Sequence, residues 1–294
     1  MFRILVLGFR ISILFIPFYS PSSCPYPIID FYPLSNIMKC MRLRYLPVII
    51  FGLLFVSLPC VFSQDLSPRE IVKHSDDLMR GDTQEGIYEM TITTPTWERT
   101  LRLYVKSKGR DKMFIRILSP SKEKGTTTLR IKSEMWNYLP QVERTIKIPP
   151  SMMLQPWMGS DFANDDLVKE SSVVDDYEHT LTRQEKIDGQ DIYVIVLMPK
   201  PKAGVVWNKR IMKIRKKDFI PVRDEFYGKD EKLVKVLNYS KIEKISDRTI
   251  PTHWEMVSEI KKGHRTIIEV DKKVVYNAPI NDNAFNLQSL KSKS

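Results

Sequence analysis

Cysteine is scarce in this chain of 294 residues: there are three, and all lie within the first 63 positions. No disulfide can therefore form within the part of the chain beyond residue 63, and its stability must come from a packed core. Long apolar runs are missing there as well, since no stretch approaches the roughly 20 apolar residues of a membrane-spanning helix. The length of this part suits one large all-β domain.

Motifs for metal binding and for common hydrolytic chemistry are also missing. The four histidines are far apart and none falls in an H-x-x-H or C-x-x-C pattern, and there is no G-x-S-x-G sequence. We therefore expect no metal and no cofactor. The formal charge is +11, but lysines alternate with acids in segments such as 229–244. This alternation is typical of solvated strand faces, so we expect no nucleic acid partner and only transient contact with anionic membranes.

The first 63 residues have the composition of a targeting sequence, with two apolar runs and a single acidic residue. The second run, Leu46 to Leu58, follows the basic residues Lys39, Arg42 and Arg44. Residues 38–63 are therefore predicted to be a signal peptide, so the mature domain is expected to be secreted. The mature domain is predicted to span residues 64–294, and residues 1–37 are interpreted as an over-extended N-terminus.

A cysteine after a signal-peptide apolar run can become the lipid-modified first residue of a lipoprotein. Cys60 stands in that place, but Pro59 occupies the position where a small residue is required. Cleavage before Gln64 without lipid anchoring is the prediction that this arrangement favours.

One helix is predicted near the start of the domain. Ser67 can cap it, Pro68 suits its first turn, Glu70 completes a capping box and Gly81 ends it. Its apolar stripe is expected to contain Ile71, His74 and Leu78.

From Glu85 onward the apolar period changes from 3.6 to 2, with Tyr88, Met90 and Ile92 on one face. Further strands are predicted at Arg99 to Lys106, Lys112 to Leu118, Thr126 to Ile131, Met135 to Leu139, Arg144 to Ile148, His179 to Lys186, Ile192 to Met198, Lys209 to Arg215, Val222 to Tyr227, Leu233 to Ile242, His253 to Ile260 and Arg265 to Asp271. Many antiparallel strands joined by hairpins make a strongly curved sheet or barrel, and the missing crossover helices exclude a doubly wound nucleotide-binding fold.

The stretch from Pro149 to Asp166 interrupts the strands. It lacks period-2 alternation, and Pro156 and Gly159 divide it. A short helix at Ser151 to Gln155 followed by a loop is predicted, and the composition is that of a mobile lid.

Two interpretations of this stretch differ in function. Asp161, Asp165 and Asp166 could supply paired carboxylates for a hydrolase. The same aspartates equally suit turn and N-cap positions before Leu167, which needs no catalysis. Ser160 is expected to hydrogen-bond within its own loop.

The competing interpretation is a carrier of apolar ligands. Methionine is pliable and recurs at surfaces that accept varied apolar partners, and tryptophan offers a large apolar area. Aromatic residues at period 2 usually fill an ordinary core. A curved sheet with few helices, however, leaves space on its concave side that a ligand can occupy. Twelve residues are predicted to line an apolar cavity or its lid: Trp97, Phe114, Trp136, Tyr138, Met152, Met153, Trp157, Met158, Phe162, Trp207, Trp254 and Met256. Gly159, Ser160 and Asp161 are predicted to shape the lid.

Two segments, MWNYLPQVERTIKIPPSM and WMGSDFANDDLV, resemble the outer-membrane lipoprotein-sorting proteins of the LolA-like superfamily. The resemblance extends from about Ser67 to Leu290 and includes Asn277 to Ile280 near the C-terminus. It implies an open, strongly curved antiparallel half-barrel whose short helices cover an apolar cavity.

By the same resemblance, the ligand is an acyl chain of a lipoprotein or another lipid, and the partner is an inner-membrane transporter of the RND or ABC type. It implies no catalytic residue. A sensor or adaptor of the same fold, which binds a partner protein through its concave face and carries no cargo, remains the first alternative.

Overall fold

The computed structural model describes residues 66–169, 173–201, 203 and 205–292. The predicted targeting segment, residues 1–63 with Cys60, lies outside the described residues. No helix in these ranges is long and apolar enough to cross a membrane.

The predicted first helix is present as α3, Pro68–Arg80. The hydroxyl of Ser67 accepts a hydrogen bond from the backbone N–H of Glu70, the Glu70 carboxylate accepts one from the Ser67 N–H, and Gly81 caps the other end. The predicted apolar stripe was only partly right. Ile71 is buried, but His74 is exposed and lies against the ring of Phe219, with 4.9 Å between ring centroids.

Each predicted strand is present, most within three residues of the expected bounds. The strands are β1 Thr83–Thr93, β2 Glu98–Lys108, β3 Lys112–Ser119, β4 Thr127–Ile131, β5 Glu134–Leu139, β6 Arg144–Lys147, β7 Tyr177–Ile187, β8 Gln190–Pro199, β9 Lys209–Arg215, β10 Pro221–Tyr227, β11 Leu233–Ile245, β12 Arg248–Ser258, β13 Arg265–Val270 and β14 Val275–Tyr276. Sequence analysis did not anticipate the short β14, which pairs with β1.

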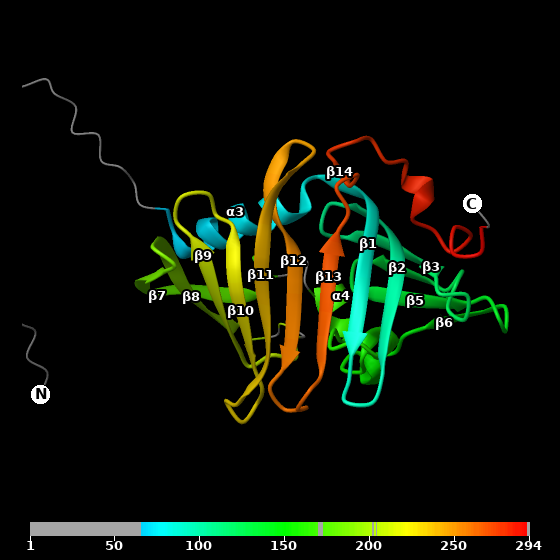
Figure 1. Cartoon of the computed structure of the whole chain (residues 1–294), viewed down its shortest axis with the longest axis horizontal. Coiled ribbons are helices and arrows are strands. Elements are labelled where there is room, and N and C mark those ends of the chain that lie inside the picture. Colours follow the sequence, from blue (N-terminus) through cyan, green and yellow to red (C-terminus); the bar gives the residue numbers. More distant parts are fainter. Residues whose placement is uncertain (1–65, 170–172, 202, 204, 293–294) are drawn as a thin grey trace, which may run out of the picture. The chain divides into compact units, whose positions relative to one another are not determined.

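The strands form one antiparallel sheet that is not closed into a barrel. Its order is β6-β5-β4-β3-β2-β1-β13-β12-β11-β10-β9-β8-β7, so β6 and β7 are its two edges. The sheet is strongly curved, and α3 lies across it (Figure 1). The predicted fold class, an open antiparallel half-barrel with few helices, is confirmed.

The two faces of the sheet bury different clusters. The concave face carries the main core, which includes Tyr88, Met90 and Leu103. On the convex face, Phe114 and Leu129 pack with Ile280, Phe285 and Leu290 of the C-terminal segment. Residues on both faces of β3 and β4 are therefore buried.

The connection between β6 and β7 must run from one edge of the sheet to the other, because these strands are the two ends of the strand order. We call residues 149–169 of this connection the cover. The cover contains two 3₁₀ turns, Pro150–Met152 and Trp157–Gly159, and the short helix α4, Asn164–Lys169. The predicted helix at residues 151–155 is present only in part, as the 3₁₀ helix Pro150–Met152 and the turn that follows it, and the regular helix begins after Ala163.

Candidate functional site

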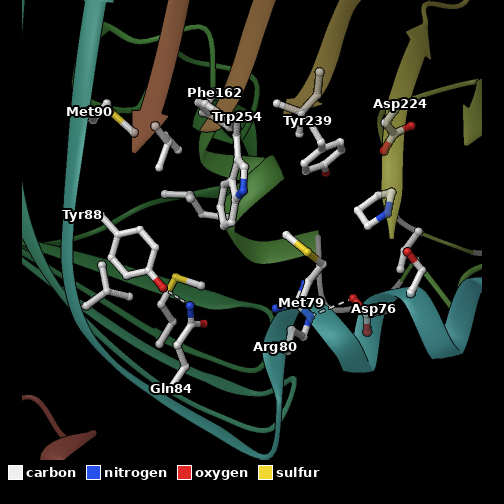
Figure 2. Close-up of a pocket in the computed structure, with 18 of the residues that line it drawn as sticks. Asp76, Met79, Arg80, Gln84, Tyr88, Met90, Phe162, Asp224, Tyr239 and Trp254 are labelled. Carbon is white, nitrogen blue, oxygen red and sulfur yellow. Dashed lines mark hydrogen bonds and ion pairs between the residues drawn. The ribbon is translucent and has the colours of Figure 1, made fainter. Parts of the chain in front are cut away.

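A cavity of about 150 Å³ lies between the concave face, α3 and the cover. Its walls are mostly apolar, and the sheet contributes side chains from β1, β2, β3, β9, β10, β11, β12 and β13. Figure 2 shows Tyr88, Met90, Trp254 and Tyr239 directed toward this space, with Met79 of α3 below them. The curvature of the sheet brings these side chains together from strands that are far apart in the sequence.

The cover closes this cavity with aromatic side chains that sequence analysis had selected. Trp157 and Phe162 line the cavity together with Trp254. Trp157 is 1 % exposed, and its indole N–H donates to the Thr128 hydroxyl at 3.1 Å. Met152, Met153 and Met158 are partly buried against the same core.

A smaller pocket of about 30 Å³ adjoins the cavity beneath α4. Trp207 and Met256, two further candidates, line this pocket. The Trp207 ring packs edge-on against Phe226, with 5.3 Å between centroids.

Of the twelve candidates, only Trp157, Phe162 and Trp254 line the cavity itself. Four others lie away from both pockets and from the main core. Phe114, Trp136 and Tyr138 belong to the cluster on the convex face, where the C-terminal segment covers them. Trp97 is 44 % exposed in the β1–β2 hairpin and stacks on the Arg99 guanidinium at 5.4 Å. Period-2 alternation shows which residues share a face of a strand, but it does not show which face is concave.

Sequence analysis missed the polar groups of the cavity. Asp224 of β10 is 1 % exposed and forms an ion pair with Arg210 of β9. At the α3 end, the Asp76 carboxylate binds Arg80 at 2.8 Å and Arg110 at 2.7 Å. Gln84 donates to the Tyr88 hydroxyl. The signal that could have found the first pair is an acid within the alternating apolar pattern of β10.

Burial controls the protonation of these groups. It raises the pKa of Tyr88 well above its usual value, and it raises the pKa of Tyr177 to about 12. Burial also raises the pKa of Asp224, while the positive charge of Arg210 opposes the rise. The phenols are therefore neutral hydrogen-bonding groups at neutral pH.

Polar contacts fix the cover to the sheet. The Asp166 carboxylate forms an ion pair with Lys235 of β11, and it accepts hydrogen bonds from the Trp207 indole at 3.3 Å and the Ala163 N–H at 2.6 Å. Lys235 also donates to the Asp161 carbonyl at 3.2 Å. Both partners of the ion pair are nearly buried, with side-chain exposures of 6 % and 10 %.

The residues predicted to shape the lid form a tight loop within the cover. The Thr266 hydroxyl donates to the Asp161 carboxylate at 2.8 Å and accepts from the Asp161 N–H at 2.9 Å. The Ser160 hydroxyl donates to the Trp157 carbonyl at 2.7 Å. Gly159 has a φ of +77°, a conformation that glycine adopts without steric cost.

This geometry does not favour a catalytic role for the three aspartates. Asp161 and Asp166 are both occupied in holding the cover to the sheet, and Asp165 is 2 % exposed. Within the part of the chain that the structure describes, no group of three or more histidine, cysteine or acidic residues could hold a metal ion.

Several solved structures share this architecture. A domain from Vibrio parahaemolyticus named for outer membrane lipoprotein sorting aligns over 76 % of this chain and 98 % of its own length, with 24 % identity and a TM-score of 0.69. A DUF1329 family protein from Desulfovibrio piger aligns over 76 % and 97 %, with 24 % identity and a TM-score of 0.71. A LolA superfamily protein from Nitrosomonas europaea aligns over 76 % and 100 %, with 23 % identity and a TM-score of 0.65.

A sequence family described as "Uncharacterized protein" matches residues 109–292, which is more than half of the chain. The chain belongs to this family, and its fold is LolA-like. A comparison with curated proteins gives no match. The cavity of this LolA-like domain is thus enclosed by the half-barrel on one side and by the cover and α3 on the other.

Proposed function

We propose that this LolA-like protein is a periplasmic carrier that holds the acyl chain of a lipoprotein or another lipid. The supporting observation is the apolar cavity, which lies beneath a separate segment of chain that is not part of the sheet. The cover contributes Trp157 and Phe162 to the cavity wall but no strand to the sheet. Its displacement would open the cavity along the concave face.

The energetics of lipid transfer favour an apolar site beneath a cover. Each methylene removed from water contributes about 0.8 kcal/mol, so a sixteen-carbon chain needs roughly 13 kcal/mol of apolar shelter outside a bilayer. The polar groups that line the cavity, such as Gln84 and the buried Arg210–Asp224 pair, can face the polar part of an amphiphile. Transfer would begin at an inner-membrane transporter, the partner that the LolA-like resemblance implies.

Organic extraction of gently purified protein, followed by mass spectrometry, tests this proposal. We expect one class of acyl lipid in the extract and saturable binding of a fluorescent fatty acid. The variant Val105→Trp places a bulky ring in the cavity wall and should weaken fatty-acid binding by about tenfold or more. The matched control Val275→Trp changes an exposed residue of β14 and should bind normally.

Protein that carries no lipid and binds no fatty acid would refute the carrier proposal and favour a sensor of the same fold. The intact mass of the secreted chain tests the proposed localisation separately. A chain that starts at Gln64 would support cleavage without lipid anchoring, and a lipid-modified chain that starts at Cys60 would show that the protein is cleaved earlier and anchored to a membrane. A chain that keeps residues 38–63 would refute signal-peptide cleavage.

A further inference from the structure

Three large apolar side chains are exposed at one end of the half-barrel. Trp97 lies in the β1–β2 hairpin, Ile260 in the β12–β13 hairpin and Leu154 in the cover, and they are 44 %, 63 % and 62 % exposed. The tips of these hairpins lie side by side at the lower end of the sheet (Figure 1), because β1 pairs with β13 up to Thr93 and Arg265.

Contacts between these segments make the exposed residues one surface. Leu154 and Ile260 line the same surface pocket of about 120 Å³. A Cβ atom added to Gly263 would lie 3.2 Å from Pro95, so the two hairpin tips touch. We call the surface formed by Pro95, Trp97, Leu154 and Ile260 the docking rim.

The docking rim is also joined to the cover. The Arg99 guanidinium stacks on the Trp97 ring and donates a hydrogen bond to the Met158 carbonyl. A partner that binds Trp97 would therefore lie next to the cover.

Two exposed lysines follow Ile260 in the β12–β13 hairpin. The sequence Glu259 to Arg265, EIKKGHR, contains three lysine or arginine residues against one acid. Lys261 and Lys262, which follow Ile260, are both exposed. Tryptophan with flanking lysines is typical of segments at the membrane–water interface, where the indole ring lies among headgroups and lysine attracts anionic lipid. Protein interfaces, in contrast, are depleted of lysine.

We propose that the docking rim binds the surface of an anionic lipid bilayer and holds the cover against it. Trp97, Leu154 and Ile260 would enter the headgroup region, while Lys261 and Lys262 would contact anionic headgroups. This inference rests on the proposed carrier function, since it gives the direction from which an acyl chain enters the cavity.

Sedimentation with vesicles tests the docking rim. The full secreted protein should sediment with phosphatidylcholine vesicles that contain phosphatidylglycerol and about tenfold less with phosphatidylcholine alone. The variant Trp97→Ser, Leu154→Ser, Ile260→Ser should lose vesicle binding by about tenfold or more. The variant Lys261→Gln, Lys262→Gln should lose the preference for phosphatidylglycerol.

A matched control removes apolar residues from the opposite end of the sheet. Ile242 and Val275 are 42 % and 45 % exposed, and Ile242→Ser with Val275→Ser should leave vesicle binding unchanged. Tryptophan emission gives a direct second readout: it should shift to shorter wavelength with anionic vesicles, and Trp97→Phe should reduce that shift.

Three outcomes would overturn the docking proposal: no sedimentation with anionic vesicles, unchanged sedimentation of the triple serine variant, or binding only to membranes that retain their proteins. The last result would assign the rim to a protein partner. Measuring fatty-acid binding in solution distinguishes the carrier proposal from the docking proposal. Vesicle binding without fatty-acid binding would refute the carrier function alone, and the reverse would refute the docking rim alone.

Discussion

The ion pair between Asp166 and Lys235 gives the sharpest test of how the cover is held. Asp166→Asn preserves the size of the side chain and removes its charge. The Lys235 ammonium would then remain nearly buried, with the Asp161 carbonyl at 3.2 Å as a hydrogen-bond acceptor in the cover. Removing one member of a buried pair typically costs about 3–5 kcal/mol. We expect a loss of this order in the free energy of unfolding.

A double-mutant cycle separates the pair from its surroundings. Lys235→Met removes the ammonium and leaves the Asp166 carboxylate with the Trp207 and Ala163 donors. The double variant Asp166→Asn, Lys235→Met contains no unpaired charge, so it should be more stable than the sum of the single changes predicts. Urea denaturation measures the global effect, and limited proteolysis of the cover measures local opening.

The control for this cycle is Asp230→Asn, which breaks an exposed ion pair with Lys232. Exposed pairs contribute little, so its denaturation curve should match that of the wild type. If Asp166→Asn left both the unfolding curve and the proteolysis of the cover unchanged, the pair would not hold the cover, and the reasoning would be wrong.

Three further predictions concern packing and pH. Trp157→Ala should lower the free energy of unfolding by about 3–5 kcal/mol, whereas Trp157→Phe, which loses mainly the hydrogen bond to Thr128, should cost about 1 kcal/mol; equal costs in urea denaturation would contradict this. Burial lowers the pKa of His179, so the unfolded chain binds more protons below the ordinary value of about 6.5, and stability should fall as the pH drops through it; His179→Gln should reduce this slope. Gly86→Ala should lower the melting temperature, because its Cβ would lie 2.7 Å from the Cα of Val274.

The strands were predictable because their local signals agree. Alternation, turn residues and the capping box of α3 all favour the observed elements. The face that each strand presents to the cavity was not predictable in the same way. Phe114 and Ile115 are adjacent apolar residues of β3, and each is buried, one under the C-terminal segment and the other in the main core. Which of the two lies on the concave face depends on the curvature of the whole sheet.

The cover shows a second limit of sequence analysis. Its prolines, Gly159 and mixed composition indicated a separate segment. Trp157 and Phe162, which were predicted to line the cavity or its lid, lie in the wall of the cavity. The contacts of Asp166 with Lys235 and of Asp161 with Thr266 join residues that are far apart in the chain. Because such pairs leave no local pattern, three aspartates could suggest catalysis as readily as structure.

The pairing of β1 with β13 has a consequence for biosynthesis. Thr93 of β1 pairs with Arg265 of β13. Strand β1 therefore cannot complete its pairing until one of the last strands has been synthesised. All other neighbours on the main strand path are consecutive along the chain, and they can form as soon as each hairpin is complete. Until residue 270 has emerged, β1 therefore presents an open hydrogen-bonding edge in the middle of the future sheet. Chaperone protection of the nascent chain would have to last until that strand is available.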